Sequence, residues 1–472
     1  MGYICQQDDL SILRSGQLEF YSKIEILDRG LKIINSFEAQ LLSDSFSIDS
    51  DSDIRRTYKC ELHVKDNSWF IGREKKIWMD KLVRPYVGLK NPRTEEIKWY
   101  LMGTYCMSET SYSFSETSNT LSLSCSDLMC SLNGDAGGHI EGLSFKIEEG
   151  NEIRKVIIDL LEQNNVTRYS VCNIPQTIPY DLEFNANVTY YEIFKEILDL
   201  YPEYEMFFDV YGIFTVQKIP TCESDPVMLD NNIFSQFVIE ESNLSTSFKD
   251  IYNHVQVWGQ NIDVDGFTNA STYANNVYSA SITSVAKLEG FKKYGVYISA
   301  ENTADNTKLN ISNLGAKNIM IDEEKAITKG YITSPGDYAF KYRKATDDFL
   351  LLGQYQVFGE AYDTNPQSPF TIENLGYELL YVYEGGEYEK IYTDDLANQR
   401  ARYEIYQHTN LQQTLELTML IIPWLDVNQK IEYQSRNSEN IYPYIIKNIS
   451  GSTGATMEVT LTRFYPEYPQ II

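Results

Sequence analysis

The sequence predicts a mainly β fold with a smaller α+β part, and three observations support this class. Tyr occurs 36 times and Phe 21 times among the 472 residues, and aromatic side chains suit the pleated, half-buried surface of a strand. Segments in which apolar and polar residues alternate recur along the chain, as expected of strands that bury one face. Two segments near residue 150 and residue 190 have helical periodicity instead. The length suggests about three domains of roughly 150 residues each.

Strand patterns dominate the first third of the chain. Residues 58–64 alternate apolar with polar side chains, and residues 121–125 repeat the pattern. The Ser-rich residues 111–119 predict the loop of a hairpin before the second of these strands. Residues 134–142 are rich in Gly and predict a linker. A phosphate-binding loop is the alternative, but no Lys followed by Ser or Thr comes after it.

A small α+β domain is expected over residues 145–225. Apolar residues in 151–164 recur at helical spacing, which predicts one amphipathic helix. Thr189 and Glu192 match a capping box that starts a second helix, and Pro202 ends it. Strands at 206–210 and 213–217 then predict a hairpin.

The rest of the chain again favours strands. Residues 261–369 are polar with mixed short strand signals, and predict an inserted β-rich domain or long loops. Residues 377–383 and 387–392 predict a hairpin across Glu384, Gly385 and Gly386, and a helix is expected from Asp394 to about residue 407. Short strands near 415–422, 445–449 and 457–461 then suggest a small barrel or sandwich.

Charge and composition exclude several classes of protein. The chain has 40 basic and 67 acidic residues, a net charge of −27, so wrapping of DNA on a basic surface is disfavoured. Seven scattered cysteines predict free thiols rather than a disulfide framework. The first ten residues lack a signal-peptide pattern, and the longest apolar runs are too short to span a bilayer. We therefore expect no membrane insertion.

No catalytic or metal-binding constellation can be recognised in the sequence. The four histidines share no metal-ligand spacing; they are His63, His139, His254 and His408. Cys125 and Cys130 have no second pair at zinc-finger spacing, and Asp263 and Asp265 do not complete a calcium loop. The Tyr-rich residues 190–191 and 201–208 predict core or interface packing, since no basic residues interleave them for base stacking. We expect no catalytic residues, no cofactor, no metal and no enzyme activity.

Three groups of segments resemble phage baseplate hub proteins through their order and spacing. The first comprises residues 99–105 (Trp-Tyr-Leu-Met-Gly-Thr-Tyr), 121–127 (Leu-Ser-Leu-Ser-Cys-Ser-Asp) and 132–134 (Leu-Asn-Gly); Met102 replaces the Leu that is typical of the family. The second is the helical segment 151–161 after residues 147–150. The third comprises residues 368–372, Gly376, the helix at 394–406 with Ala397 and Ala401, and residues 422–428. Similarity to tail hubs of phages and tail-like particles of low-GC Gram-positive hosts is the nearest match.

The resemblance implies two small β-barrel hub domains, a small helical α+β domain and a β-rich insertion. After an N-terminal segment at 1–19, the first barrel would span 20–140 and the second 235–260 with 370–472. Three copies would form a pseudo-hexameric ring at the virion tail tip, assembled in the host bacterial cytoplasm. The ring would join the tail tube or distal tail proteins to the spike or tip proteins, and DNA would pass through its bore without specific binding.

Two other functions remain open from the sequence. One is a β-rich hydrolase of cell-wall or other glycans, which needs two carboxylates at a fixed separation that a sequence cannot reveal. The other is a tail protein that binds a receptor or carbohydrate, for which exposed aromatic clusters in 261–369 would be the sign.

Overall fold

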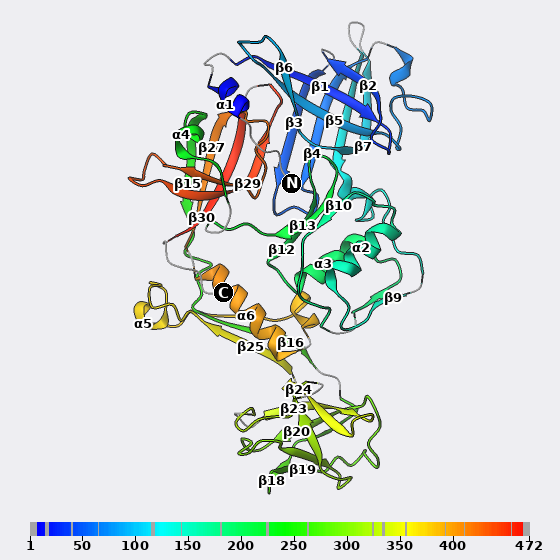
Figure 1. The fold of residues 1–472 in the computed structure, drawn as a ribbon, viewed down its shortest axis with the longest axis vertical. Helices are drawn as coiled ribbons and strands as arrows, with labels where there is room; N and C mark the ends of the chain where they lie inside the picture. Colours follow the sequence, from blue (N-terminus) through cyan, green and yellow to red (C-terminus); the bar gives the residue numbers. More distant parts are fainter. Residues whose placement is uncertain are drawn as a thin grey trace. The chain divides into compact units, whose positions relative to one another are not determined.

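The computed structural model describes most of the chain as a mainly β protein (Figure 1). The described residues are 7–14, 18–38, 41–64, 66–114, 119–142, 144–179, 182–222, 226–261, 264–322, 325–332, 336–354, 356–391, 393–409, 411–454 and 456–465. They divide into two compact units. Unit 1 contains the described residues of Met1–Phe248 and Leu411–Pro466, and unit 2 contains those of Lys249–Asn410. The expected mainly β class is therefore confirmed.

Unit 1 is built on a 14-stranded sheet, in which both ends of the chain take part. The N-terminal strands are β1 (Phe20–Leu27), β2 (Ile33–Glu38), β3 (Leu41–Asp49), β4 (Arg56–His63), β5 (Leu82–Lys90), β6 (Ile97–Leu101), β7 (Tyr105–Phe114) and β8 (Asn119–Asp127). The later strands are β14 (Val227–Leu229), β15 (Val238–Thr246), β27 (Leu411–Leu420), β28 (Lys430–Tyr433), β29 (Tyr442–Gly451) and β30 (Thr456–Tyr465). Pairing is antiparallel except between β14 and β28.

The sheet contains the same four-strand arrangement twice. We call β3, β4, β8 and β7 the N-terminal quartet, and β15, β27, β30 and β29 the C-terminal quartet; each is given in its order across the sheet. If the strands are numbered by their position across the sheet, the chain passes through each quartet in the order first, second, fourth and third. The first and fourth strands of both quartets carry a β-bulge against their neighbours. The quartets are joined where β29 pairs with β3. Figure 1 shows the orange and red C-terminal strands next to blue β3.

The core of unit 1 lies along the apolar faces of these strands. Tyr58, Cys60 and Leu62 on β4 are buried, and so are Leu121 and Leu123 on β8. The period-of-two patterns predicted for both strands are thus confirmed, because each strand turns one side chain in two into the core. The predicted Ser-rich loop is shorter than expected, since β7 continues to Phe114; residues 115–118 lie outside the described part.

Short helices complete this part of unit 1. They are α1 (Gln7–Leu13), η1 (Asn67–Trp69), η2 (Leu128–Ser131) and α4 (Asn231–Phe234). Asp127 caps η2, because its side chain accepts a hydrogen bond from the backbone N–H of Met129.

The α+β elements of unit 1 match the predicted pattern. They are β9 (Ser144–Ile147), α2 (Ile153–Gln163), β10 (Tyr169–Val171), β11 (Leu182–Asn185), α3 (Tyr190–Asp199), β12 (Tyr204–Phe208) and β13 (Phe214–Lys218). Thr189 and Glu192 form the predicted capping box. The β12–β13 hairpin is confirmed, with β10 added in parallel beside β13. Buried apolar residues lie along one stripe of each helix.

One part of unit 2 is a three-stranded sheet covered by a helix. β16 (His254–Asn261) lies between β25 (Gln356–Tyr362) and β26 (Leu380–Tyr383), and α6 (Asp394–His408) packs on it (Figure 1). A Cβ added at Gly359 would lie 2.1 Å from the backbone carbon of Ala397. Only Gly at this position lets α6 approach the sheet so closely.

The other part of unit 2 is an eight-stranded, nearly closed barrel. Its strands are β17 (Gly266–Thr268), β18 (Ser271–Ala274), β19 (Val277–Ala280), β20 (Lys293–Ile298), β21 (Lys308–Ile311), β22 (Lys317–Met320), β23 (Gly336–Arg343) and β24 (Asp348–Gln354). Buried Tyr, Ile, Val, Leu and Phe side chains fill its core.

The structure differs from the sequence expectations at two places in unit 2. The sequence expectation combines 235–260 with 370–472 in one barrel, whereas β16 pairs on both edges with β25 and β26 and belongs to unit 2. The predicted strand at 387–392 is instead the 3-10 helix η3 (Gly386–Lys390), after α5 (Ile372–Leu375) and β26. Gly385 and Gly386 have φ of 76° and 56°, and this turn brings Tyr388 onto Tyr383 and Glu404.

Candidate functional site: a buried junction in unit 1

Two adjacent arginines at the start of β4 form the centre of a buried polar junction. Arg56 is ion-paired with Asp426, and its Nη1 donates a hydrogen bond of 2.9 Å to the carbonyl oxygen of Phe208. Its backbone N–H donates to Asp127 Oδ2 at 2.9 Å. The Arg56 side chain is 1% exposed. This one residue therefore connects β4, the end of β12 and the loop that follows β27.

Arg55 likewise contacts β12, and through Glu205 it is linked to the loop that follows β27. It is ion-paired with Glu205 on β12, and its guanidinium carbon lies 3.8 Å from the centroid of the Phe207 ring. Glu205 also accepts hydrogen bonds from Asn428 Nδ2 at 2.6 Å and Gln217 Nε2 at 2.9 Å. A buried carboxylate that is paired and hydrogen-bonded in this way has its desolvation cost offset.

The local charges hold Arg56 in its ionised form. Burial alone would lower the pKa of Arg56, but the nearby Asp426, Tyr105 and Asp127 raise that pKa above its usual value. Burial raises the pKa of Asp127, although the N–H groups of Met129 and Arg56 and the charge of Arg56 favour the carboxylate. The junction is therefore a network of ion pairs and hydrogen bonds around two buried arginines.

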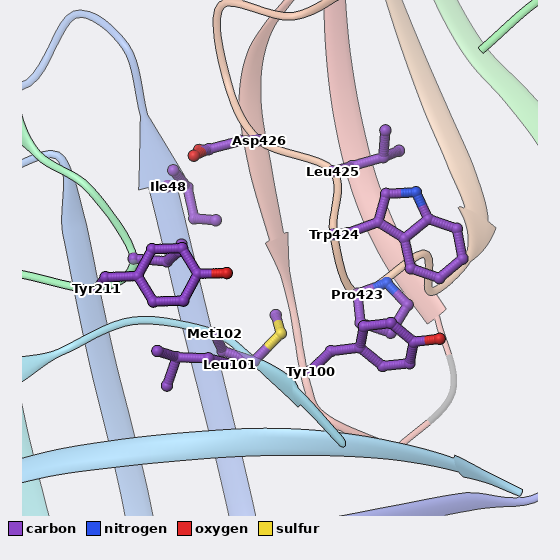
Figure 2. Close-up of a pocket in the computed structure, with 10 residues that line it drawn as sticks. Ile48, Tyr100, Leu101, Met102, Tyr211, Pro423, Trp424, Leu425 and Asp426 are labelled. Carbon is purple, nitrogen blue, oxygen red and sulfur yellow. The ribbon is translucent and has the colours of Figure 1, made fainter. Parts of the chain in front are cut away.

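A small open pocket lies beside this junction (Figure 2). Its cavity volume is about 30 Å³, and it is open to solvent on one side. Figure 2 shows Tyr100 beside Pro423 and Trp424, whereas the Leu101 side chain points away from Trp424. The remaining lining residues are Ile48, Met102, Val210, Tyr211, Leu425 and Asp426. The rings of Tyr100 and Trp424 are 5.1 Å apart. Such a lining accommodates an apolar side chain, and it offers no adjacent nucleophile and base.

The structure separates the residues that were considered as catalytic or metal-binding candidates. His63 lies on β4, and exposed His139 contacts the carbonyl oxygen of Asn187. Asp265 is paired with Lys292, and Asp263 lies outside the described residues. Cys125 and Cys130 are free thiols in the core. Within the described ranges, no group of three or more His, Cys, Asp or Glu side chains could hold a metal ion.

Two histidines in unit 2 have carboxylate partners, and those of His254 are far away in the sequence. His254 lies 2.8 Å from Glu360 Oε1 and 2.5 Å from Glu378 Oε1. His408 contacts the hydroxyl of Tyr383 at 2.9 Å and lies 3.7 Å from Glu404 Oε2. Tyr383, Glu360 and Glu378 are 25 to 124 residues away from their histidine in the sequence, so no local motif could show them. Glu404 is one helical turn before His408.

The junction itself was missed by sequence reasoning. Its only signals are the adjacent Arg55 and Arg56 before an alternating strand, and the polar Asp426 and Asn428 after an apolar run. Charged residues at strand ends usually lie in solvent, so this pattern alone could not indicate burial.

The fold is similar to that of a solved prophage tail protein. The 43 kDa tail protein of prophage MuSo2 from Shewanella oneidensis aligns with a TM-score of 0.50 and 11% identity, over 93% of this chain and 98% of that chain. The expected similarity to phage tail proteins is therefore confirmed for the fold. A tail protein from Neisseria meningitidis MC58 aligns with a TM-score of 0.49 and 8% identity, over 94% of this chain and 96% of its own.

A third solved structure and a family model also match the chain. Prophage tail protein gp18 from Listeria monocytogenes EGD-e has a TM-score of 0.42 and 9% identity, over 93% of this chain and 94% of its own. Residues 367–468 match the model of a domain of unknown function, DUF5048. None of the curated proteins matches the chain. Among the described helices, none has the length and apolar character needed to cross a membrane.

Proposed function

We propose that this chain is a structural protein of a phage-type tail tip. In this proposal three copies form a pseudo-hexameric hub ring that joins the tail tube to the tip and surrounds the DNA exit channel. The shared fold with the prophage MuSo2 tail protein supports the tail role. The two quartets, each with its companion strands, would be the two hub barrels.

The proposed ring rests on the repeated quartet. Within one chain, the fourth strand of the C-terminal quartet (β29) pairs with the first strand of the N-terminal quartet (β3). If the same junction forms between chains, the fourth strand of the N-terminal quartet (β7) pairs with β15 of the next copy. The strand directions agree, since both β3 and β15 run antiparallel to their second strands. Three chains would then supply six equivalent quartets in a closed ring.

The exposure of these two strands supports this pairing. β15 is an edge of the sheet, and Ile239 and Leu244 on it are 50% and 37% exposed. β7 pairs with β5 only at its first two residues, so its later part has a free edge, and Phe114 is 60% exposed. An unprotected edge with apolar side chains favours pairing with another chain.

The acidic charge supports passage of DNA through such a ring. Each copy has a net charge of −27, so DNA phosphates would be repelled rather than bound along the bore. The other partners in this proposal are the tail tube or distal tail proteins on one side and the spike or tip proteins on the other. The site of action would be the virion tail tip.

Cysteine cross-linking in assembled tails tests the proposed ring. Cysteines introduced at Ser113 on β7 and Leu244 on β15 should form disulfides between copies under mild oxidation, and non-reducing gels should show dimers and trimers. The pair Ser113→Cys with Ser245→Cys serves as a register control, because residue 245 turns to the other face of β15.

Two outcomes would contradict different parts of the proposal. Tails that contain the chain but give no cross-link at any register of β7 and β15 would exclude this strand pairing. A chain that is not found in any tail particle would exclude the tail role itself.

A further inference from the structure

Phe291 in the unit 2 barrel is exposed and held in an unfavourable backbone conformation. Its side chain is 84% exposed, and its φ is 66°. The N–H of Lys292 donates to the carbonyl oxygen of Glu289, so Phe291 is the third residue of a tight turn, a position that favours Gly or Asn. A large side chain there costs stability, and such strain is typical of functional positions.

Three lysines surround this turn, and no ion pair of their ammonium groups is found in the described part of the chain, although the backbone N–H of Lys293 donates to Asp265 Oδ2 at 2.9 Å. Lys293 and Lys341 are direct partners on the antiparallel strands β20 and β23, and like charges placed opposite each other destabilise a sheet. Lys341 Nζ lies 6.0 Å from the Phe291 ring, and the Lys344 side chain lies beside Gly290. We call Phe291 with these lysines the Phe291 patch.

Other cations at this end of the barrel are already neutralised. Lys292 is paired with Asp265 at 2.7 Å, Lys287 with Glu289 at 2.9 Å and Arg343 with Asp348 at 2.7 Å. The three lysines of the patch therefore form a local positive surface on a strongly acidic chain. An exposed aromatic ring flanked by ammonium groups fits an acidic surface that also has apolar side chains.

The three-stranded sheet of unit 2 has a surface of that kind. One face packs on α6, and the opposite face presents Tyr362, Leu380 and Val382, which are 43%, 44% and 40% exposed. Glu360 and Glu378 lie on this face beside His254. We call Tyr362, Leu380, Val382, Glu360 and Glu378 together the open sheet face. Burial would raise the pKa of Glu360, but hydrogen bonds from Gln256, His254 and Tyr362 lower it, so Glu360 is a carboxylate.

We propose that the Phe291 patch of one copy docks on the open sheet face of a second copy. The contact is head-to-tail, so each copy uses its patch on one neighbour and its open sheet face on another. Phe291 packs against Leu380 and Val382, while the three lysines meet the carboxylates of Glu360 and Glu378. The contact is separate from the proposed β7–β15 pairing, and it offsets both the backbone strain and the Lys293–Lys341 repulsion.

A zero-length cross-linker tests this contact on the full-length chain. A carbodiimide joins a Lys amine to a carboxylate as an amide, with loss of one water. Equal amounts of ¹⁴N and ¹⁵N protein are mixed, cross-linked and digested for mass spectrometry. We expect mixed-isotope peptides that join Lys293, Lys341 or Lys344 to Glu360 or Glu378. Peptides of a single isotope only would place the contact within one chain and overturn the proposal.

Variants separate the contact from general effects on folding. Phe291→Gly should raise the melting temperature of unit 2, because Gly relieves the positive φ, and should also reduce the mixed-isotope peptides at least tenfold. Leu380→Ala should weaken the same peptides, and the double variant should lose no more than the stronger single variant. Tyr331→Ala, at a position 48% exposed in the same unit, is the matched control and should have no effect.

Two results would reject the proposal. One is unchanged cross-linking in Phe291→Gly. The other is binding of the Phe291 patch to vesicles of phosphatidylglycerol and phosphatidylcholine without any mixed-isotope peptide, which would assign the patch to an anionic membrane. Loss of the β7–β15 cross-link with the lysine cross-links retained would reject only the ring proposed above.

Discussion

Arg56 shows how much of unit 1 depends on one side chain. It bonds to Asp127, Phe208 and Asp426, which lie 71, 152 and 370 residues away in the sequence. Three segments that fold as separate local patterns are thus connected through one guanidinium. A planar cation with five donors can satisfy several acceptors at once, which Lys cannot do.

Asp426→Asn should destabilise unit 1 strongly. The substitution leaves the charge of Arg56 buried without its counter-ion, a change that typically costs about 3–5 kcal/mol. Urea unfolding followed by tryptophan fluorescence measures the loss. Asp51→Asn is the control, since the exposed Lys447–Asp51 pair, 3.4 Å long, contributes about 1 kcal/mol or less. Equal losses in the two variants would contradict a structural role for the junction.

The His408–Glu404 pair should make the stability of unit 2 depend on pH. Burial would lower the pKa of His408, but Glu404 and the carbonyl oxygen of Asp250 raise it above 6.5. A histidine with a raised pKa stabilises the folded state fully below its ordinary pKa, and this contribution is lost as pH rises through the raised value.

The free energy of unfolding of unit 2 should therefore fall as pH is raised from about 6 to about 8, the range in which histidine titrates. His408→Gln should flatten this dependence. Chemical denaturation at a series of pH values measures it, with His139→Gln as the control because His139 lies on the surface of unit 1. A variant with the same slope as the native chain would rule out His408 as the titrating group.

At the level of elements, contact between α6 and its sheet requires a residue without a side chain. The Cβ of any other residue at position 359 would meet the backbone of Ala397 and Asn398. Ala397 and Ala401 are fully buried on the same side of α6. Small residues on both elements therefore set how closely the helix packs.

Gly359→Ala should force α6 away from the sheet. Overpacking of this kind typically costs about 1–3 kcal/mol, and calorimetry should show it as a lower melting temperature of unit 2. Gly336→Ala is the control in the same unit, because its added Cβ would make only an ordinary 3.5 Å contact with Tyr338. A melting temperature that is equally unchanged in both variants would show that the helix adjusts freely.

The elements that could be predicted from sequence are those whose signals are local. The capping box at Thr189 and Glu192, the helices at 153–163 and 394–408, and the β12–β13 hairpin all follow from residues within one segment. The strand expected at 387–392 failed because Tyr388 packs against Glu404 on α6. Local alternation cannot detect such a distant partner.

For the whole molecule, the sequence could indicate the β class but not which strands pair. The β29–β3 junction joins residues about 400 positions apart, and no pattern in either strand identifies its partner. The buried ion pairs of Arg55 and Arg56 could not be predicted for the same reason, because their partners are far away in the sequence. β16 does not pair with the last strands of the chain, because β25 and β26 occupy its two edges.

Unit 1 should fold without unit 2. In the N-terminal quartet, six residues (50–55) connect β3 to β4, and unit 2 occupies the equivalent connection between β15 and β27. Thr246 and Gln413 are direct partners in the ladder, so a short loop can join them. A chain in which six Gly and Ser residues replace residues 249–410 should keep its sheet and unfold cooperatively.

Circular dichroism and thermal unfolding measure this outcome. Deleting the same number of residues across β4 and β8 is the control, and it should give an unfolded chain. A shortened chain that fails to fold would mean that unit 2 contributes contacts needed by the 14-stranded sheet.

The same connection has a mechanical consequence. Because the chain leaves β15 and returns on β27 at adjacent positions, tension applied through unit 2 acts on one end of that ladder. Both strands are then pulled in the same direction along their length, so this tension does not separate β15 from β27. The load passes instead as shear to the ladder between β27 and β30, where ten residue pairs share it.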